Sequence, residues 1–387
     1  MRILVLSKRQ YMGKDLLDDR FGRFREIPLE LARSGNVVSG FAISYRRREE
    51  NITEDIDQEA KGNVKWHCIN ASKRFFPRVG NVIRRAVRIA DDFKPDLIWA
   101  GSDAYVATFG AWLAKHTGSR CVIDLYDNFE AFRASKIPGV LPLFRRAVRN
   151  TDGVSCFSTR MANYVIHTYA RKKTTTVVES GVRSDLFYPQ DRSACRQRLG
   201  LPLDAKIVGT AGALDHSRGV ETLFRAYEKL AAEQHNLHLA LAGPRKAGLP
   251  VPGGPRVHDL GNLPHESVPY FVNALDVSVI CYRYSPQGEF SFPQKAYEIM
   301  ACRVPMVAAA VGSMNEVLQN FPSCLYQPED PVSLANAISR QLQTKELVEG
   351  TVPSWADSAK LLSDFFAEVV NQAPLSVTPD AEPAATH

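Results

Sequence analysis

Long hydrophobic stretches are missing from this chain, and no apolar run approaches the roughly 20 residues that a membrane-spanning helix needs. The opening segment, Met1–Gln10, has too short an apolar core for a signal peptide and is predicted to be the first strand. The seven cysteines are odd in number and include no C-x-x-C pair, and no His/Cys cluster has zinc-site spacing. These absences predict reduced thiols, a cytoplasmic location and no zinc site.

Charge is unevenly distributed along the 387 residues, although the formal net charge is only +6. Residues 1–185 contain 32 Lys and Arg against 21 Asp and Glu, whereas the remainder contains 16 against 21. The first half is therefore expected to attract an anionic partner: nucleic acid, an acidic membrane surface or an anionic acceptor. Solvated surface charge is the alternative. Because no nucleic-acid recognition motif is present, we expect no nucleic-acid partner.

Short apolar runs alternate with helical patterns twice along the chain, which is typical of parallel sheets covered on both faces. The strands predicted in the first half are Ile3–Ser7, Val37–Ile43, Val64–Cys68, Leu97–Ala100, Cys121–Leu125, Gly153–Phe157 and Thr175–Val178. Those in the second half are Ile207–Ala211, Leu237–Ala242, Val257–Leu260, Val277–Cys281 and Pro305–Ala309. Helical patterns lie between them, for example Leu17–Arg33 and Val220–Glu233. We predict an α/β protein with two doubly wound, Rossmann-like domains, and ligands in the cleft outside the carboxyl ends of the strands.

The predicted domain boundary lies in a segment with prolines that begins at Leu186. We expect an N-terminal domain over residues 1–188 and a C-terminal domain over residues 189–352. An amphipathic helix over residues 353–372 is expected to pack back on the N-terminal domain. Residues 373–387 are rich in Pro, Ala and Thr and are predicted to be a disordered tail.

One predicted helix has an isolated carboxylate among apolar side chains. In S-F-P-Q-K-A-Y-E-I-M-A, residues 291–301, Pro293 suits the first helical turn, and Glu298 lies among Ala, Tyr, Ile and Met. The following run V-P-M-V-A-A-A-V predicts a strand buried on both faces. A buried carboxylate is costly unless a donor group meets it, and a pair of sugar hydroxyls would supply such donors. Glu298 is therefore a candidate for sugar binding.

Several segments together resemble the family-four retaining glycosyltransferases, which have the GT-B fold. The segments are E-L-A-R-S-G-N-V-V in the first half, S-G-V-R-S-D-L-F-Y-P at 180–189, G-A-L-D-H-S-R-G at 212–219, L-A-G-P at 241–244, A-L-D-V at 274–277, and the P-x-K-x-x-E-x-M-A helix. Each is weak alone, but their order and spacing cover nearly the whole chain. The resemblance implies a GT-B protein whose C-terminal domain binds a nucleotide-sugar donor.

The loop at residues 212–219 is expected to hold the donor diphosphate. It lies between a predicted strand and a helix, so backbone N–H groups and the helix dipole can meet phosphate oxygens. Arg218 stands where the family has a diphosphate-binding lysine, and its guanidinium fork suits phosphate. Ala213 replaces a family arginine in this loop, and Lys295 is the candidate substitute. An arginine that is merely exposed at a helix start is the alternative for Arg218.

Glu298 corresponds to the second glutamate of the family's E-x7-E motif, which holds the ribose hydroxyls. The first glutamate of that motif falls on Phe290, and Glu289 lies one residue earlier. Gly312 and Ser313 resemble paired glycines at the next helix start, although Ser313 could equally be an ordinary helix N-cap. The predicted donor-binding residues are Gly212, Arg218, Gly219, Glu289, Lys295, Glu298, Gly312 and Ser313.

The acceptor side is predicted to include the segment D-L-Y-D-N-F-E, residues 124–130, which follows a buried strand. Tyr126 stands where many relatives have a histidine. Asp127 could take the acceptor proton, while Asp124 or Glu130 orients the sugar, unless Asp124 is only a strand-end cap. The first loop resembles the family's loop beside the donor phosphates, with Gly13 and Gly22 as its glycines. The predicted acceptor-side residues are Gly13, Gly22, Asp124, Tyr126, Asp127 and Glu130, and the predicted catalytic residues are Asp127, Arg218 and Glu298.

In this family the leaving diphosphate helps to deprotonate the incoming hydroxyl on the same face. The resemblance therefore implies transfer with retention of configuration, no cofactor, and no metal if Arg218, Lys295 and helix N-termini stabilise the diphosphate. Asp55 and Asp57 spell a D-x-D, but they lie in a charged stretch that is interpreted as a solvated loop.

Two basic amphipathic stretches, residues 72–90 and 137–150, fit peripheral association with an anionic membrane. The alternative is that one face packs on the sheet while the arginines point outward. The expected function is transfer of a sugar from a nucleotide sugar to a glycan or lipid-linked acceptor in cell-surface polysaccharide synthesis, at the inner face of the plasma membrane. Two alternatives are a nucleotide-sugar 2-epimerase and a catalytically inactive relative, the latter because of Ala213, Phe290 and Tyr126.

Overall fold

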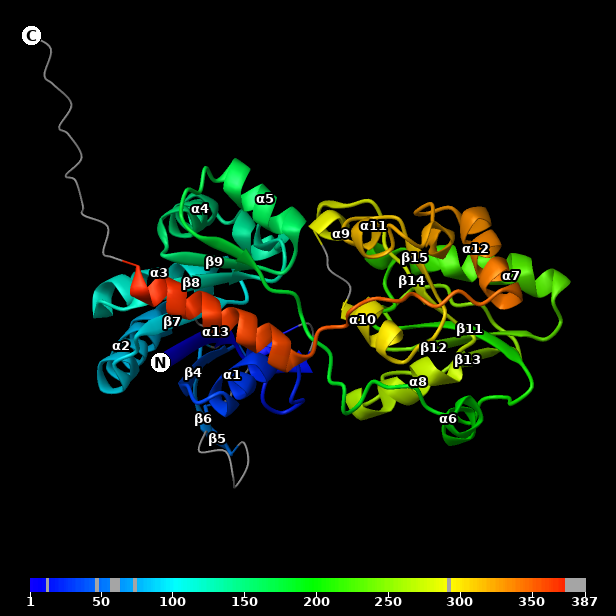
Figure 1. Ribbon diagram of the computed structural model, residues 1–387, viewed down its shortest axis with the longest axis horizontal. Coiled ribbons are helices and arrows are strands. Elements are labelled where there is room, and N and C mark those ends of the chain that lie inside the picture. Colours follow the sequence, from blue (N-terminus) through cyan, green and yellow to red (C-terminus); the bar gives the residue numbers. More distant parts are fainter. Residues whose placement is uncertain (12–13, 46–48, 56–62, 72–74, 291–293, 373–387) are drawn as a thin grey trace, which may run out of the picture.

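The computed structural model describes residues 1–11, 14–45, 49–55, 63–71, 75–290 and 294–372. Two sheets with parallel strands stand side by side, and the chain passes between them twice (Figure 1). The prediction of an α/β protein with two Rossmann-like domains is confirmed. The predicted tail at residues 373–387 lies outside the described residues.

The sheet of the first domain has eight strands in the order β10-β9-β8-β7-β1-β4-β6-β5. Their bounds are β1 (Arg2–Lys8), β4 (Val37–Ser44), β5 (Asn51–Asp55), β6 (Asn63–Asn70), β7 (Leu97–Gly101), β8 (Arg120–Leu125), β9 (Gly153–Cys156) and β10 (Thr175–Val177). A small antiparallel hairpin, β2 (Gln10–Tyr11) and β3 (Lys14–Asp15), follows β1. The strand order reverses at β1, between β7 and β4, and ligands of such sheets bind at this kind of switch point.

Strand β5 is a departure from the predicted solvated loop around Asp55. It pairs antiparallel with β6 at the edge of the sheet, with Asn51 opposite His67. Charged side chains suit an edge strand because one side of its backbone faces water. The charged composition of this segment is typical of a loop, which is why the strand was not predicted. Asp57, the second aspartate of the D-x-D, lies outside the described residues.

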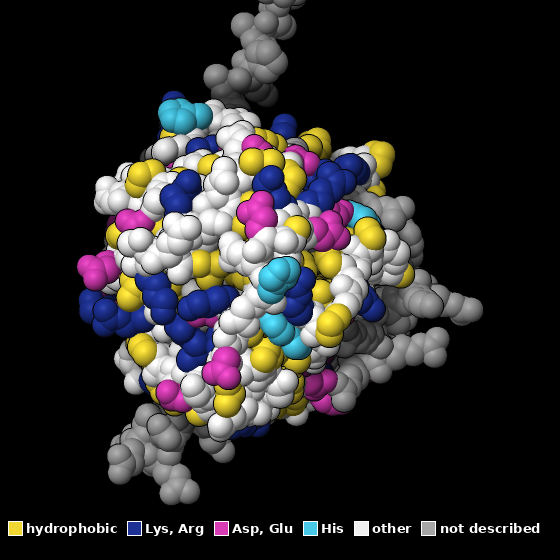
Figure 2. Space-filling view, turned by 90° about the vertical axis from the view of Figure 1, so that its right-hand side faces the viewer, with side chains coloured by type: hydrophobic (Ala, Val, Ile, Leu, Met, Phe, Trp, Pro, Cys, Tyr) yellow, Lys and Arg dark blue, Asp and Glu magenta, His cyan; other side chains and the backbone are white. Residues whose placement is uncertain are grey.

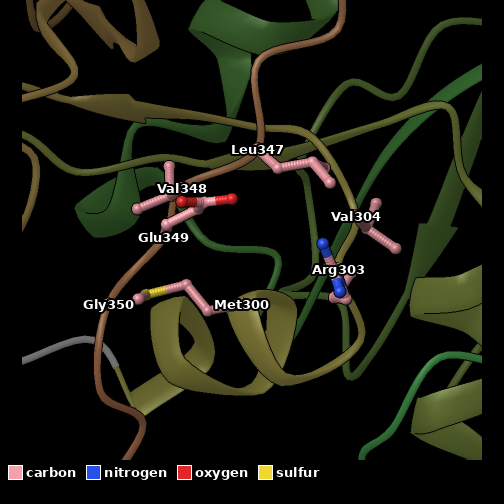
Figure 3. A pocket seen from close by; sticks show the side chains of 7 residues that line it. All are labelled: Met300, Arg303, Val304, Leu347, Val348, Glu349 and Gly350. Atoms are coloured by element: carbon pink, nitrogen blue, oxygen red, sulfur yellow. The ribbon is translucent and has the colours of Figure 1, made fainter.

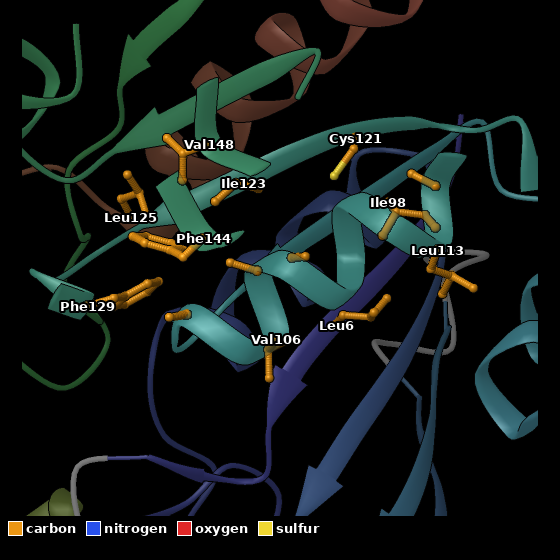
Figure 4. Packing of buried hydrophobic residues seen from close by; sticks show 14 of the residues in the cluster. Leu6, Ile98, Val106, Leu113, Cys121, Ile123, Leu125, Phe129, Phe144 and Val148 are labelled. Atoms are coloured by element: carbon orange, nitrogen blue, oxygen red, sulfur yellow. The ribbon is translucent and has the colours of Figure 1, made fainter. Parts of the chain in front are cut away.

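Helices cover both faces of the first sheet. They are α1 (Arg23–Arg33), α2 (Phe75–Phe93), α3 (Ala104–Thr117), α4 (Val140–Asn150) and α5 (Thr159–Thr168), with short 3-10 turns η1 (Phe129–Ala131) and η2 (Arg133–Lys136). One face packs against α2 to α5 through a cluster that includes Leu6, Ile98 and Ile123 (Figure 4). Local signals set the ends of α3: the Asp103 carboxylate accepts from the Val106 N–H at 2.8 Å, and Gly118 ends the helix with φ 70°.

The second sheet has six parallel strands in the order β13-β12-β11-β14-β15-β16. Their bounds are β11 (Lys206–Ala211), β12 (Leu237–Ala242), β13 (Val257–Asp259), β14 (Val277–Ile280), β15 (Met306–Ala309) and β16 (Leu325–Tyr326). All four residues of β14 and of β15 are buried, as expected for strands covered on both faces. The strand order reverses at β11, between β12 and β14, which places a second switch point at the end of β11.

Helices α7 and α12 pack together on one face of the second sheet, and α6, α8 and α10 cover the other. The helices are α6 (Arg192–Leu199), α7 (Val220–Glu233), α8 (Val268–Ala274), α9 (Pro286–Phe290), α10 (Gln294–Ala301), α11 (Met314–Val317) and α12 (Pro331–Gln343), with turns η3 (His216–Arg218), η4 (His265–Ser267) and η5 (Pro322–Cys324). The outer end of this domain shows basic and acidic side chains interspersed (Figure 2). None of the helices in the described ranges combines the length and apolar character needed to cross a membrane.

The last helix, α13 (Trp355–Asn371), returns to the first domain and packs beside α1, as predicted (Figure 1). Phe366 is fully buried there and lies 6.1 Å from Trp99, between ring centroids. The two connecting segments touch where they cross, because the Val182 N–H donates to the Pro353 oxygen at 2.9 Å. The two domains are therefore joined by a pair of adjacent segments.

Candidate functional site

Strand β11 ends in the loop at residues 212–219, which requires glycine at its first position. Gly212 has φ 114°, and a Cβ built there would lie 2.6 Å from the Lys295 Nζ atom. Lys295 therefore passes directly over the loop. Gly219, with φ 70°, forms the left-handed junction between η3 and α7. The Gly212 N–H donates to the Ala242 oxygen at 2.8 Å and the Gly219 N–H to the His216 oxygen at 3.0 Å, so the two glycines shape the loop at the carboxyl edge of the sheet rather than offer free amides.

Two cationic side chains meet at this loop. The Lys295 ammonium donates to the Ala211 oxygen at 2.6 Å, and the Arg218 guanidinium donates to the Tyr282 hydroxyl at 3.0 Å while lying over its ring. Burial lowers the pKa of Lys295 to about 8, and the charge of Arg218 acts in the same direction. Two positive charges held this close favour an anion between them.

Glu298 lies one helical turn beyond Lys295 on α10 and is 8% exposed. Burial raises the pKa of its carboxyl group to about 7, against the opposing effect of Lys295. No hydrogen bond to this carboxylate comes from the residues that the structure describes. A carboxylate in this setting gains from a ligand that supplies hydroxyl donors.

Gly312 and Ser313 directly precede α11, and Gly312 lies against the backbone of Gly288 and Glu289. Gly312 has φ 55°, and a Cβ built there would lie 2.6 Å from the Gly288 oxygen, so only glycine fits without strain. Ser313 is buried, yet it makes no side-chain cap, and its hydroxyl has no hydrogen-bond partner among the described atoms. The ordinary N-cap interpretation of Ser313 is therefore not what the geometry shows. A buried, unpaired hydroxyl is suited to a ligand oxygen.

Glu289 lies at the boundary between the domains. Its carboxylate forms an ion pair with Arg160 of α5, and the same arginine lies 3.8 Å from the Glu316 carboxylate. Phe290, at the position of the family's first glutamate, packs on Tyr164 with 4.9 Å between ring centroids. Both side chains are thus directed toward the first domain.

Asp127 links the two halves of the site electrostatically. It follows β8 in the first domain, and its carboxylate accepts from the Asn128 N–H at 2.7 Å. Burial raises its pKa, whereas that hydrogen bond and the charges of Arg218 and Lys8 oppose the rise. Asp127 of the first domain is therefore within electrostatic reach of Arg218 of the second domain.

The other predicted acceptor-side residues have partners within the first domain. Asp124 is fully buried. Its carboxylate accepts two hydrogen bonds from the Arg23 guanidinium group, both at 2.9 Å, and one from the Ser155 hydroxyl at 2.6 Å. The Tyr126 hydroxyl donates to the Ser102 oxygen at 3.0 Å. Asp124 and Tyr126 therefore hold the end of β8 through contacts within the first domain.

Glu130 belongs to a separate polar cluster. It accepts from both nitrogens of the Arg145 fork, at 2.7 and 2.8 Å, and from the hydroxyls of Tyr164 and Tyr169. Burial opposes its ionisation, but these hydrogen bonds outweigh burial and lower its pKa. Its role as an acceptor ligand stays a prediction.

The first loop reaches the second domain. Gly22 precedes α1 with φ 99°, and the neighbouring Phe21 packs edge-on against His265 with 5.1 Å between ring centroids. Gly13, the other predicted glycine of this loop, lies outside the described residues.

Sequence reasoning missed several residues at the boundary. Tyr282 supports Arg218, and Arg160 holds Glu289. The Tyr297 hydroxyl donates to the Glu179 carboxylate at 2.7 Å, which ties α10 to the segment that leaves the first domain. For the Tyr297 contact, the available signal in the sequence was the isolated acidic residue Glu179 just before the domain junction. No local pattern indicated the contacts of Tyr282 and Arg160.

A cavity of about 280 Å³ lies at the far end of α10, away from Lys295 (Figure 3). It is lined by Met300, Arg303, Val304, Leu347, Val348, Glu349 and Gly350. None of the predicted site residues lines it. Within the described ranges, no group of three His, Cys, Asp or Glu side chains is arranged to hold a metal ion.

Comparison with known proteins adds the family. Residues 205–344 match the family described as Glycosyl transferases group 1. This match spans the second domain from β11 to α12, including Arg218, Lys295 and Glu298. The second domain is therefore similar to the group 1 glycosyltransferases, and the two-domain architecture is that of the GT-B fold. The predicted resemblance is thereby confirmed.

Curated relatives within this group include two D-inositol 3-phosphate glycosyltransferases. The one from Nocardioides is 29% identical over 210 residues, which is 48% of this chain and 45% of the relative. The one from Geodermatophilus obscurus is 32% identical over 201 residues, 48% of this chain and 44% of the relative. The chain therefore spans about half the length of the curated relatives that it matches.

Solved glycosyltransferase structures share the fold over nearly the whole chain. The sucrose-phosphate synthase of Thermosynechococcus elongatus superimposes with a TM-score of 0.74 at 19% identity, covering 95% of this chain and 99% of that one. Anabaena HepE in complex with UDP gives a TM-score of 0.65 at 19% identity, covering 96% and 97%. At these identities the likeness concerns the fold.

Proposed function

We propose that this protein transfers a sugar from a nucleoside diphosphate sugar to an acceptor hydroxyl in the crevice between its domains. The main support is the pairing of two cations, Arg218 and Lys295, over a glycine loop, with the buried carboxylate Glu298 one helical turn away. A diphosphate would bring negative charge to the two cations, and the adjacent ribose would bring hydroxyl donors to the carboxylate.

The comparisons support the donor class. Anabaena HepE, which shares the fold, has been solved with UDP and with UDP-glucose. In the proposed complex Arg218 and Lys295 bind the diphosphate, Gly212 and Gly219 let the loop approach it closely, and Glu298 accepts from the ribose hydroxyls. The Ser313 hydroxyl, which has no partner among the described atoms, is proposed to meet the sugar or its phosphate together with Gly312.

The proposed reaction proceeds with retention and without a metal. The bond between the anomeric carbon and the diphosphate oxygen breaks as the acceptor oxygen bonds to the same face of the sugar, and the acceptor proton passes to the departing diphosphate. Arg218 and Lys295 stabilise the charge on the leaving group, which is the main electrostatic requirement. Asp127, facing Arg218, orients the acceptor hydroxyl.

The proposed acceptor is a glycan or a lipid-linked saccharide, used at the cytoplasmic face of a membrane in polysaccharide synthesis. Support comes from α4 and the segment before it, where Leu143 is 58% exposed and Ile137 is 55% exposed. Arg146 is exposed on the same helix. Apolar side chains beside arginines suit an anionic bilayer surface.

The donor assay is the direct test. Purified protein is incubated with a panel of nucleotide sugars and acceptors, with and without EDTA, and release of free nucleoside diphosphate is measured. We expect turnover that EDTA leaves unchanged. Arg218→Gln and Glu298→Gln should each lower kcat/KM by at least about tenfold, because each removes a charged hydrogen-bonding partner. The matched controls Arg225→Gln and Glu228→Gln change exposed residues of α7 and should stay near wild type.

A catalytically inactive relative is the second candidate, because Phe290 occupies the position of a family glutamate and Glu289 is tied to Arg160. Nucleotide binding without turnover of any donor would favour it. Isomerisation of the donor without diphosphate release would instead indicate a nucleotide-sugar 2-epimerase.

A further inference from the structure

The outer flank of the first domain contains a hollow of about 540 Å³ between α2 and the strand β6. Three arginines of α2 line it, Arg84, Arg85 and Arg88, together with His67 and Asn70 of β6. These arginines belong to the basic amphipathic stretch at residues 72–90, and the proposed transfer reaction does not use them.

The strand order explains why a hollow exists here. Strands β6 and β5 are the last two at one edge of the sheet, whereas α2 packs over β1 and β4. The outer side of α2 therefore overhangs the sheet edge. His67 and Ile69 point to the α2 side of β6, because Trp66 and Cys68, on the opposite side, pack in the cluster with α1.

The arginines form one stripe along α2, on the flank of its buried positions. Val82, Ala86 and Ala90 face the core. Arg84 donates to the Asn81 amide oxygen at 2.5 Å, and Arg85 donates to the Asn51 amide oxygen at 2.9 Å. Arg88 also lines the hollow and makes no ion pair or hydrogen bond with any described residue.

The charge of the hollow is positive. Glu49 and Asp92 also border it, so three guanidinium groups stand against two carboxylates. Arg84 and Arg85 each donate to a neutral asparagine side chain, so these hydrogen bonds bring no negative charge to the hollow. Burial lowers the pKa of His67, and the charges of Lys65 and Arg85 act in the same direction. His67 is therefore neutral at pH 7 and contributes one N–H donor.

We propose that this hollow binds a phosphate ester through Arg85 and Arg88, with His67 as an additional donor. Guanidinium groups bind phosphate oxygens bidentately. Two of them separated by one helical turn can bind the same phosphate group. The volume accommodates the phosphate together with the alcohol that it esterifies.

The hollow is separate from the transfer site. Asp127 follows β8, and four strand spacings of about 4.8 Å separate β8 from β6, which gives about 19 Å. A small acceptor cannot span that distance with its phosphate in the hollow and its hydroxyl at Asp127. The bound phosphate ester therefore belongs either to a lipid headgroup at a membrane surface or to a separate soluble molecule.

The first experiment is titration of the full chain with inorganic phosphate, followed by the NMR signals of the His67 ring. We expect saturable shifts and a rise in the His67 pKa, since a bound anion stabilises the imidazolium form. Arg85→Gln/Arg88→Gln should weaken this binding by at least about tenfold. Lys115→Gln/Arg146→Gln removes the same net charge from exposed positions of α3 and α4 and should retain binding within about twofold, because exposed charges at a distance are screened.

A second variant guards against misfolding. Arg88→Glu changes only an exposed side chain without a described partner, and it should abolish phosphate binding while leaving UDP affinity unchanged. Unaltered UDP affinity also separates this proposal from the proposed transfer function, which uses the other domain. Absence of a saturable His67 shift, or equal shifts in wild type and Arg88→Glu, would overturn the proposal.

Vesicle sedimentation distinguishes the two sources of phosphate. If the ligand is a lipid headgroup, vesicles with one-to-one phosphatidylglycerol and phosphatidylcholine should pull down wild type but less Arg85→Gln/Arg88→Gln, and inorganic phosphate should compete. If the ligand is a soluble ester, glycerol phosphate should shift the His67 signals while sedimentation is equal for both proteins. Either result supports a phosphate-ester site and assigns its source.

Discussion

Glu298 and Lys295 lie one turn apart on α10, and burial shifts both toward their neutral forms. Such a pair is poised for a ligand that brings negative charge to the lysine and hydroxyl donors to the glutamate. The unbound protein must therefore hold these groups at a cost in folding free energy. That cost is measurable at the scale of single residues.

Glu298 should make the free energy of unfolding depend on pH. Its pKa rises from 4.5 to about 7 on folding, so the folded state binds more protons than the unfolded state between these values. Stability from this group is therefore fully present below pH 4.5 and is lost as the pH rises through about 7, by up to about 3 kcal/mol. In Glu298→Gln this loss should disappear, as measured by urea unfolding at pH 5 and pH 8.

Glu228→Gln is the control for that comparison, because Glu228 is exposed on α7. It should keep the wild-type difference between the two pH values. An identical difference in wild type and Glu298→Gln would show that the carboxyl group at position 298 titrates normally.

Gly212 is the second residue for which the structure predicts a specific effect of substitution. In Gly212→Ala the new methyl group would lie 2.6 Å from the Lys295 Nζ atom, in a backbone conformation with φ 114° that alanine rarely adopts. Lys295 must therefore move away from the loop. We expect UDP affinity, measured by calorimetry, to fall by at least about tenfold. Gly200→Ala, at a positive-φ position with nothing within 4 Å, controls for backbone strain alone and should retain affinity.

At the scale of elements, the buried strands were predictable because nearly every residue in them is apolar or small. The predicted strand Leu237–Ala242 agrees with β12 at both ends. The edge strand β5 was missed because its N-I-T-E-D sequence has the composition of a loop, and only its pairing with β6 makes it a strand. The predicted helix Leu17–Arg33 begins six residues later, at Arg23, because Gly22 has φ 99° and Asp18 instead binds Arg9.

The residues of the candidate site also fall into two groups, those that could be predicted from the sequence and those that could not. The loop at residues 212–219 and the carboxylate at Glu298 could be found from sequence because each depends on neighbours along the chain. The burial of Asp124 against Arg23 could not, since these residues are 101 positions apart and no local pattern links them. Contacts made by tertiary packing are not encoded in local periodicity.

Helix α13 gives a prediction at this scale. Phe366 is fully buried against Trp99 and the surrounding first-domain cluster, although it lies beyond the second domain in sequence. Phe366→Ala should lower the free energy of unfolding of the first domain by about 3–5 kcal/mol, the usual cost of such a cavity. Leu361→Ala, on the same helix but 57% exposed, should cost less than about 0.5 kcal/mol. Equal effects of the two substitutions on urea unfolding would contradict the packing of α13.

At the scale of the whole molecule, the domains meet through side chains from segments far apart in sequence. Arg160 pairs with Glu289, Tyr164 packs on Phe290, and the Tyr297 hydroxyl donates to Glu179. Most of these residues are partly exposed, so each contact is individually weak. Weak contacts around two connecting segments allow the domains to change their separation when a ligand arrives.

Arg160 is the residue through which this balance can be tested, since it reaches both Glu289 and Glu316 of the second domain. Arg160→Gln removes the pair and should favour a wider separation of the domains. Exposed ion pairs contribute about 0.2–1 kcal/mol, so we expect up to about a fivefold rise in the donor KM, with kcat changed less. Small-angle scattering should show a larger radius of gyration for the unbound variant, and saturating UDP should reduce the difference. Arg146→Gln, an exposed arginine of α4, serves as the control. If Arg160→Gln matches it in both measurements, the ion pair does not set the separation of the domains, and Glu289 would then be free to meet the donor sugar.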